Sequence, residues 1–261
     1  MRRVLAAAAL GAATAAAIPA AAQIPGNAAR VDPATRGKPS HLLIDLRVSE
    51  DPKAGGRTPQ SAVLATPAGF KLDTRARAER CSAEQAKAFN CPANSRIGTG
   101  TADATASNGV FSQAVVADIE MFLAPPLKSG DIAGVVIRFK ERSTGQQGSA
   151  SGRIVKAAAP FGTEVRFEDL GSATGAAPEG FTVRVDRLRS DVGASRKQKV
   201  TVCCKTVTRN GVKKKVKYKK NVTRHLITNP KTCDGAWEYQ VRLRYSESDE
   251  SVRDGAISCS G

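Results

Sequence analysis

The side chains that could carry chemistry in this sequence are few, and the most suggestive are carboxylates spaced two or four residues apart. Asp118 and Glu120 share one parity, as do Glu164 and Glu168, so each pair would lie on one face of a β-strand. Two neighbouring carboxylates can hydrolyse a glycosidic bond, one as acid and the other as nucleophile or base. Alternating strands also carry such charges on their solvent face, so a glycan-active hydrolase is the alternative and not the preferred interpretation.

Other catalytic arrangements lack essential parts. The only two histidines are His41 and His225, whereas a serine triad or a zinc site needs histidine beside a nucleophile or further ligands. The small-residue stretch 148–152 has Ala150 at its centre, where a Gly-x-Ser-x-Gly elbow needs its serine. We therefore predict no catalytic residues, no metal site and no cofactor.

Cysteine content indicates a disulfide framework, because the chain has six cysteines and an export signal. Cys81 and Cys91 are close enough in sequence to bridge, and a Cys233 to Cys259 bridge would tie the chain end to the strand before it. The adjacent Cys203 and Cys204 leave two alternatives open. Each could cross to Cys233 or Cys259, or the two could bond to each other through a distorted peptide.

Positive charge is concentrated in one segment. The formal net charge is +16, and residues 196–224 contain twelve Lys and Arg with no Asp or Glu. Asn210 and Gly211 lie in the middle of this segment, and Asn-Gly favours a two-residue type I′ hairpin turn. Residues 199–222 are therefore predicted to form a basic β-hairpin whose paired residue numbers sum to 421.

This pairing predicts a hairpin with one partly apolar face and one lysine face. The partly apolar face would contain Cys203, Val207, Val212, Val216, Tyr218 and Val222. The lysine face would contain Lys213, Lys215, Lys217 and Lys219, opposite Thr208, Thr206, Cys204 and Val202.

The lysine-rich hairpin could bind an anionic polymer or surface, since pairing with phosphates or carboxylates releases counterions. The candidate binding residues are Lys199, Lys213, Lys215, Lys217, Lys219 and Lys220. The competing explanation is that exposed lysines prevent edge-to-edge aggregation. We expect no specific nucleic-acid partner, because the chain is exported and only 5% of its residues are aromatic, too few for base stacking.

Strands dominate the rest of the chain, because apolar and polar residues alternate with a period of two. The clearest apolar series is Trp237, Tyr239, Val241, Leu243 and Tyr245, and similar series centre on residues 42–48, 119–123, 135–139, 165–167 and 181–185. The predicted fold is an all-β, antiparallel sandwich, jelly-roll-like or immunoglobulin-like. Residues 49–60, 141–152 and 171–180 are predicted loops. Ser82 and Gln85 form a capping box before one short helix.

The N-terminus has the features of a signal peptide. Arg2 and Arg3 precede an apolar stretch over residues 4–17, and Ala20 to Ala22 provide a cleavage site. We assign residues 1–22 to the signal peptide, 23–40 to a flexible leader and 41–261 to one domain that includes the hairpin. No later segment has the length of a transmembrane helix, so we expect a secreted or cell-envelope-associated protein.

Two regions of the chain resemble a known group of proteins. They are residues 67–73 (Pro-Ala-Gly-Phe-Lys-Leu-Asp) with Cys81, Cys91 and 95–100 (Ser-Arg-Ile-Gly-Thr-Gly), and residues 229–233 (Asn-Pro-Lys-Thr-Cys) with Trp237 and Cys259. This pattern resembles secreted β-rich proteins of high-GC soil actinobacteria, a group with no assigned function. The resemblance does not extend to the lysine-rich hairpin. It implies export and a β-rich fold, and it indicates no activity and no catalytic residues.

Overall fold

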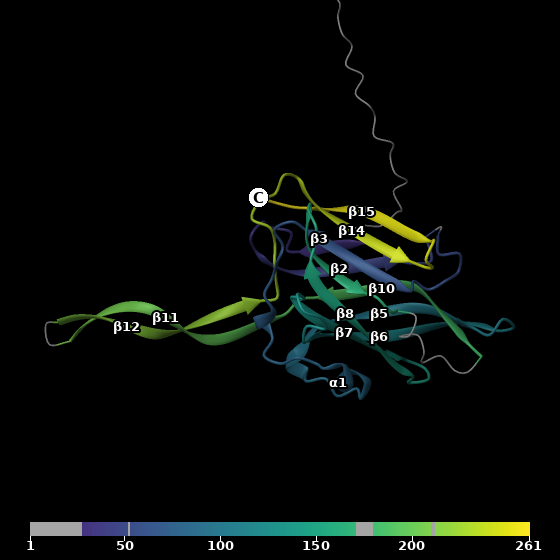
Figure 1. The fold of residues 1–261 in the computed structure, drawn as a ribbon, viewed down its shortest axis with the longest axis horizontal. Helices are drawn as coiled ribbons and strands as arrows, with labels where there is room; N and C mark the ends of the chain where they lie inside the picture. Colours follow the sequence, from purple (N-terminus) through teal and green to yellow (C-terminus); the bar gives the residue numbers. More distant parts are fainter. Residues whose placement is uncertain (1–27, 52, 171–179, 210–211) are drawn as a thin grey trace, which may run out of the picture.

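The computed structural model describes residues 28–261 apart from 52, 171–179 and 210–211 (Figure 1). The predicted signal peptide, residues 23–27 of the leader and the Asn210–Gly211 turn lie outside the described residues. The strands are β1 (Ala29–Asp32), β2 (Pro39–Arg47), β3 (Ser61–Pro67), β4 (Lys71–Leu72), β5 (Arg96–Ser107), β6 (Ser112–Ala124), β7 (Ala133–Glu141), β8 (Gln147–Lys156), β9 (Phe161–Phe167), β10 (Thr182–Val192), β11 (Ser195–Arg209), β12 (Val212–His225), β13 (Ile227–Thr228), β14 (Ala236–Arg244) and β15 (Glu250–Ser258). The helices are α1 (Ala83–Lys87) and the 3₁₀ turns η1 (Thr74–Ala76) and η2 (Ala93–Ser95).

The predicted all-β, antiparallel architecture is confirmed, and its main body is one sheet that nearly closes into a barrel. The strand order is β15-β14-β3-β9-β8-β7-β6-β5-β10-β2, and β1 pairs with β2 at the far edge. The two edges meet where Thr35 forms a parallel bridge with Ser260. The structure thus has one continuous sheet instead of the two layers of the expected sandwich. Alternation could not distinguish these, since both architectures bury one face of each strand.

The barrel interior holds the apolar series predicted from the sequence. Trp237, Tyr239 and Tyr245 are all buried. Trp237 donates its indole N–H to the carbonyl oxygen of Thr232 at 2.7 Å, and the Tyr239 hydroxyl accepts from the backbone N–H of Ala29 at 3.2 Å. These rings therefore belong to the core and do not form an open sugar-stacking surface.

The chain enters the barrel earlier than the sequence suggested. Residues 28–40 were expected to be part of a flexible leader, but β1 pairs with β2 in antiparallel register and buries Ala29 and Val31. The leader prediction is wrong for this part. A four-residue strand shows too little alternation to be recognised, and its burial depends on contacts with residues far along the chain.

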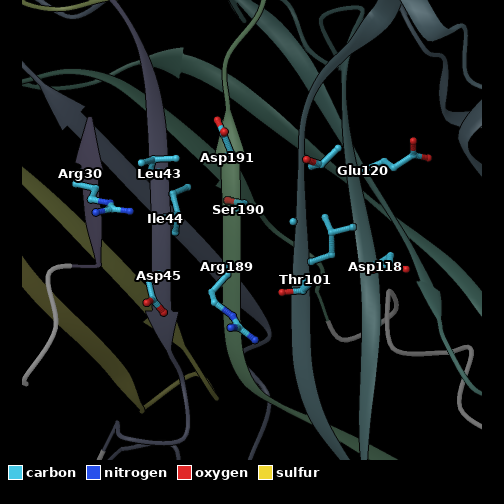
Figure 2. Close-up of a pocket in the computed structure, with 13 residues that line it drawn as sticks. Arg30, Leu43, Ile44, Asp45, Thr101, Asp118, Glu120, Arg189, Ser190 and Asp191 are labelled. Atoms are coloured by element: carbon cyan, nitrogen blue, oxygen red, sulfur yellow. The ribbon is translucent and has the colours of Figure 1, made fainter. Parts of the chain in front are cut away.

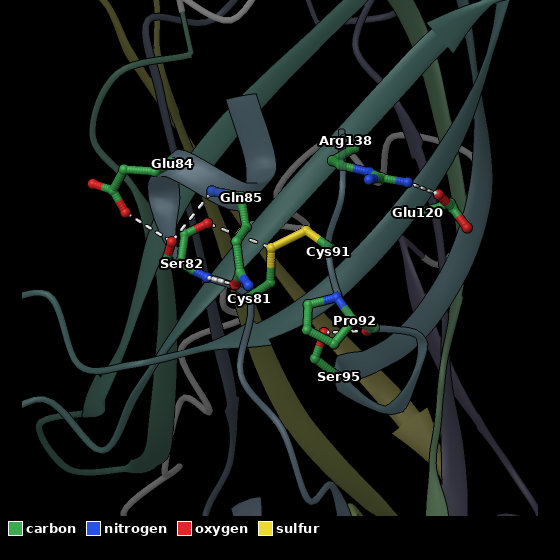
Figure 3. The surroundings of a disulfide bond; sticks show 9 residues. All are labelled: Cys81, Ser82, Glu84, Gln85, Cys91, Pro92, Ser95, Glu120 and Arg138. Atoms are coloured by element: carbon green, nitrogen blue, oxygen red, sulfur yellow. Dashed lines mark hydrogen bonds and ion pairs between the residues drawn. A yellow bond between two sulfur atoms is a disulfide. The ribbon is translucent and has the colours of Figure 1, made fainter. Parts of the chain in front are cut away.

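The predicted helix and its disulfide are confirmed on the outside of the barrel (Figure 3). The Ser82 hydroxyl accepts from the Gln85 backbone N–H at 3.2 Å, and the Gln85 side chain accepts from the Ser82 N–H at 2.9 Å. Cys81 and Cys91 are bonded, and with α1 they cover Phe122, Val136 and neighbouring apolar residues on the outer face of the sheet. The end of β6 is consequently buried on both faces.

The predicted Trp237 strand is confirmed as β14, which forms a C-terminal hairpin with β15. β14 and β15 pair from Ala236 with Ser258 to Arg244 with Glu250. The Cys233–Cys259 disulfide joins the two ends of this hairpin, as predicted. Within the described residues, no helix has the length and apolar character needed to cross a membrane.

Strands β3, β5 and β8 were not predicted, and β8 lies partly in the expected 141–152 loop. These strands contain many small residues, and glycine and alanine have little strand propensity. The sequence pattern therefore does not identify them. The structure explains two of the glycines. A Cβ on Gly152 would lie 2.7 Å from the Phe167 ring, and one on Gly100 would collide with the Arg189 carbonyl oxygen. Both positions need glycine so that neighbouring groups can approach closely.

Candidate functional site

The basic hairpin β11–β12 is a two-stranded ribbon that protrudes from one end of the barrel (Figure 1). Strands of 15 and 14 residues give it a length of about 45 Å at ~3.3 Å per residue. Its base is held by an ion pair of 2.8 Å between Arg224 and Asp73 and by a backbone bond of 2.8 Å from Leu226 to Ala194. The ribbon therefore has a fixed root and an exposed shaft.

The strand register of the ribbon changes at the adjacent cysteines. From Arg209 with Val212 to Lys205 with Val216 the paired numbers follow the prediction, but Val202, not Cys203, lies opposite Tyr218. The predicted pairing is therefore wrong from residue 203 to the base of the ribbon. Cys203 and Cys204 form a disulfide with each other within this bulge, which decides between the two alternatives left open by the sequence. An extra residue in one strand shifts every later side chain to the other face.

The shift improves the separation between the two faces. Lys199 now lies opposite Asn221, on the face of Lys219, whereas Val202 moves to the face of Tyr218. We define the lysine face by the residues Lys197, Lys199, Lys213, Lys215, Lys217 and Lys219. The other face carries Val200, Val202, Val207, Val216, Tyr218 and Val222 together with Lys205, Lys214 and Lys220.

The lysines of the ribbon are exposed and have no carboxylate partner among the described residues. Every lysine from Lys197 to Lys220 is exposed. Among the described cations of the ribbon, only Arg224 forms an ion pair with a carboxylate, and it lies at the root. Five of the six candidate lysines share the lysine face, and Lys220 lies on the opposite one. The structure thus gathers most of the candidate residues along one side of a single element.

The carboxylates Asp118 and Glu120 lie on the outer surface of the barrel, beside a groove that crosses β2, β10, β5 and β6 (Figure 2). Arg142 donates to Asp118 at 2.6 Å and lowers the pKa of that carboxyl. Partial burial raises the pKa of Glu120, but hydrogen bonds from Arg138 and Arg96 outweigh it and leave the pKa below its usual value. A general acid needs the opposite shift.

The second carboxylate pair, Glu164 and Glu168, also forms ion pairs with cationic side chains. Glu164 is buried between Arg166 at 2.6 Å and Arg242 at 3.0 Å. Glu168 binds Arg153 at 3.0 Å and Lys128 at 3.3 Å, and these cations lower the pKa of its carboxyl. Each of the four candidate carboxylates therefore already has arginine partners.

The other carboxylates along the groove also have cationic partners. Asp45 binds Arg187 through two contacts of 2.6 Å, and Arg189 binds Asp103 at 2.7 Å. His41 lies 2.7 Å from the Asp191 carboxylate on the exposed surface. In the part of the chain that the structure describes, no three His, Cys, Asp or Glu side chains converge as metal ligands. The carboxylates along the groove thus have cationic partners, whereas the ribbon contains no acidic residue.

Comparison of the chain with protein-family models, with curated proteins and with solved structures finds no match.

Proposed function

We propose that this protein is exported and acts outside the cytoplasm as a non-catalytic barrel protein, binding an anionic polymer or surface of the cell envelope through its ribbon. Three disulfides support an oxidising compartment. The paired state and lowered pKa values of Asp118, Glu120 and Glu168 argue against the alternative, a glycan-active hydrolase that needs one carboxylic acid protonated.

The observation that carries this proposal is the density of unpaired charge on the ribbon. Residues 196–224 contain twelve Lys and Arg and no Asp or Glu, and the exposed lysines among them have no carboxylate partner within the described residues. Alternate residues of a strand are about 6.6 Å apart, so Lys213 to Lys219 form a row of regularly spaced charges. A flexible polyanion could pair with each in turn and release its counterions.

The ribbon also has the geometry of a contact surface. Its root is fixed by Arg224 and Asp73, and its shaft extends away from the barrel (Figure 1). An extended element can lie along a polymer or reach a surface without steric interference from the rest of the protein. The bulge at Cys203 and Cys204 brings Lys199 onto the same face as Lys219, which lengthens the charged row.

Binding of long-chain polyphosphate to the disulfide-bonded protein tests this proposal. The test variant replaces Lys199, Lys213, Lys215, Lys217 and Lys219 with Gln. The matched control replaces five exposed barrel lysines, Lys38, Lys71, Lys87, Lys140 and Lys156, with Gln, so both variants have the same net charge.

We expect the lysine-face variant to bind at least tenfold more weakly and the barrel variant to stay within about threefold of wild type. The slope of log K against log salt should become shallower by about 3.5 to 4.5 in the lysine-face variant, at ~0.7 to 0.9 per charge lost. Equal losses in both variants would show that only net charge matters. If wild type does not bind polyphosphate and the lysine-face variant aggregates, the lysines serve to keep the protein soluble. Turnover of a polysaccharide that Glu120→Gln abolishes would favour the hydrolase.

A further inference from the structure

A cavity of about 340 Å³ lies inside the barrel, at the end opposite the ribbon. Strand β10 connects the two ends: Val183 and Val185 line the cavity near its start, and Val192 at its finish leads into β11. The cavity therefore shares no residue with the lysine face, and an inference about it does not depend on the proposed function.

The cavity exists because one stretch of the wall carries only small inward side chains. Successive inward residues of β5 are Ala102, Ala104 and Ala106, and each lines the cavity. At the other end of the barrel, Trp237 and Tyr239 fill the equivalent space. Alanine side chains are too short to meet across a barrel of this size, so the interior remains open.

The side chains of the walls determine which class of molecule the cavity can bind. They are almost entirely apolar, with Phe139 and Leu188 beside the alanines. Ordered water needs several polar partners, so apolar walls of this kind favour apolar molecules over water. The volume lies within the range of small-molecule sites. At ~30 Å³ for a water-sized group, it would accommodate on the order of ten methylene groups.

The lining also has polar side chains, namely Thr58 and, at the mouth of the cavity, Gln113, Glu141, Thr144 and Gln146, of which Gln113 and Thr144 are exposed. The Glu141 carboxylate accepts hydrogen bonds from Ser143 and Thr144, which hold its pKa at about 2. A permanently negative carboxylate at the mouth repels an anionic head group. The two glutamine amides can both donate to and accept from a neutral hydroxyl.

Apolar surface continues outside the mouth on the β5–β6 turn. Val110 is 98% exposed and Phe111 is 54% exposed, and Phe111 also lines the cavity. The Asn108 side chain accepts from the backbone N–H groups of both residues, at 3.1 and 2.7 Å. This turn therefore presents an apolar edge in a defined position beside the opening.

We propose that this end of the barrel binds a neutral single-chain amphiphile, of the fatty alcohol or monoacylglycerol class. The alkyl chain would occupy the space left by Ala102, Ala104 and Ala106, and the hydroxyl end would lie among the polar side chains of the mouth. Binding would cover the exposed Phe111 ring in part.

Displacement of a fluorescent apolar probe tests this proposal. N-phenyl-1-naphthylamine is titrated into the disulfide-bonded protein and then displaced with 1-decanol or with decanoate at pH 8. Ala104→Phe fills the cavity from β5. The matched control is Ala114→Phe on the neighbouring strand β6, because Ala114 is exposed and does not line the cavity.

We expect one probe per chain, with decanol displacing it at concentrations at least tenfold lower than decanoate. Ala104→Phe should weaken probe and decanol binding at least tenfold, whereas Ala114→Phe should bind like wild type. Glu141→Gln provides a second test if Ala104→Phe does not fold, and it should strengthen decanoate binding while leaving decanol binding unchanged.

Absence of saturable probe binding to wild type would overturn the proposal, as would equal binding by folded Ala104→Phe. Equal displacement by decanol and decanoate would overturn the assignment of a neutral head group. One probe per two chains, with dimerisation, would indicate that the apolar turn joins two copies of the chain instead.

Discussion

The buried carboxylate of Asp51 provides the sharpest test of how the barrel is stabilised. Asp51 follows β2, and its side chain is only 1% exposed. It accepts a hydrogen bond from the Tyr245 hydroxyl at 3.0 Å and one from the Lys53 N–H at 3.0 Å, and it lies 2.8 Å from the Arg253 guanidinium. Asp51→Ala would leave the Arg253 charge, itself only 13% exposed, without its counterion.

The expected cost is large, because removing one partner of a buried ion pair typically destabilises a protein by about 3 to 5 kcal/mol. For a domain of this size the melting temperature should fall by about 6 to 20 °C, at roughly 2 to 4 °C per kcal/mol. Tyr245→Phe removes only one hydrogen bond to the same carboxylate and should cost about 1 to 3 kcal/mol. Thermal and urea unfolding followed by circular dichroism measure both values.

The same carboxylate predicts a pH dependence. Burial raises the pKa of Asp51, but hydrogen bonds from Ser251, the Lys53 N–H and Arg253 outweigh it, and the pKa lies below its usual value. The folded state therefore binds the proton less readily than the unfolded state, so the contribution is present above about pH 4 and is lost as pH falls further. Asp51→Ala should have a flatter acid-side stability profile than wild type.

A loss below 1 kcal/mol in Asp51→Ala would show that the Asp51–Arg253 pair does not stabilise the barrel in this way. The same conclusion would follow if Asp51→Ala/Arg253→Met were as unstable as Asp51→Ala with Arg253 retained. Replacing both charges removes the unpaired cation, so the double variant should recover part of the loss.

Three further outcomes are expected. Gly255→Ala should destabilise the protein by about 1 to 3 kcal/mol in urea unfolding, because the new Cβ would collide with the ring of Tyr239. Gly261→Ala is the control, since a Cβ there would meet only the Arg36 side chain at 3.9 Å. Replacing Cys233 and Cys259 with Ala should cost about 3.5 kcal/mol, as the loop-entropy relation gives for a sequence separation of 26, and a melting temperature equal to wild type would contradict this. Glu141 should titrate at about pH 2 by NMR, and a midpoint near 4.3 would show that its hydrogen bonds do not form in solution.

Several local features could be derived from the sequence because neighbouring residues determine them. The capping box of Ser82 and Gln85 depends on residues three apart, and the Cys81–Cys91 bond closes a short segment. The alternation from Trp237 to Tyr245 gives the buried face of β14 directly. The candidate lysines were likewise evident from their number and from the lack of nearby acidic residues.

Other features depended on contacts between distant residues. β5 and β8 consist largely of small residues whose strand character comes from pairing with neighbours, as Gly100 and Gly152 illustrate. β1 is buried because it pairs with β2 and lies against β15 from the far end of the chain. The hydrophobic pattern of each strand is the same in a sandwich and in a barrel, so only the pairing order distinguishes them.

The composition of the ribbon, the alternation of its strands and its two adjacent cysteines are evident from the residues alone. The bond between Cys203 and Cys204, the position of Lys199 on the lysine face and the cavity beside the alanines of β5 become evident only in the folded chain. Register and enclosed volume are properties of strands that face one another, and a residue's type does not specify what lies opposite it.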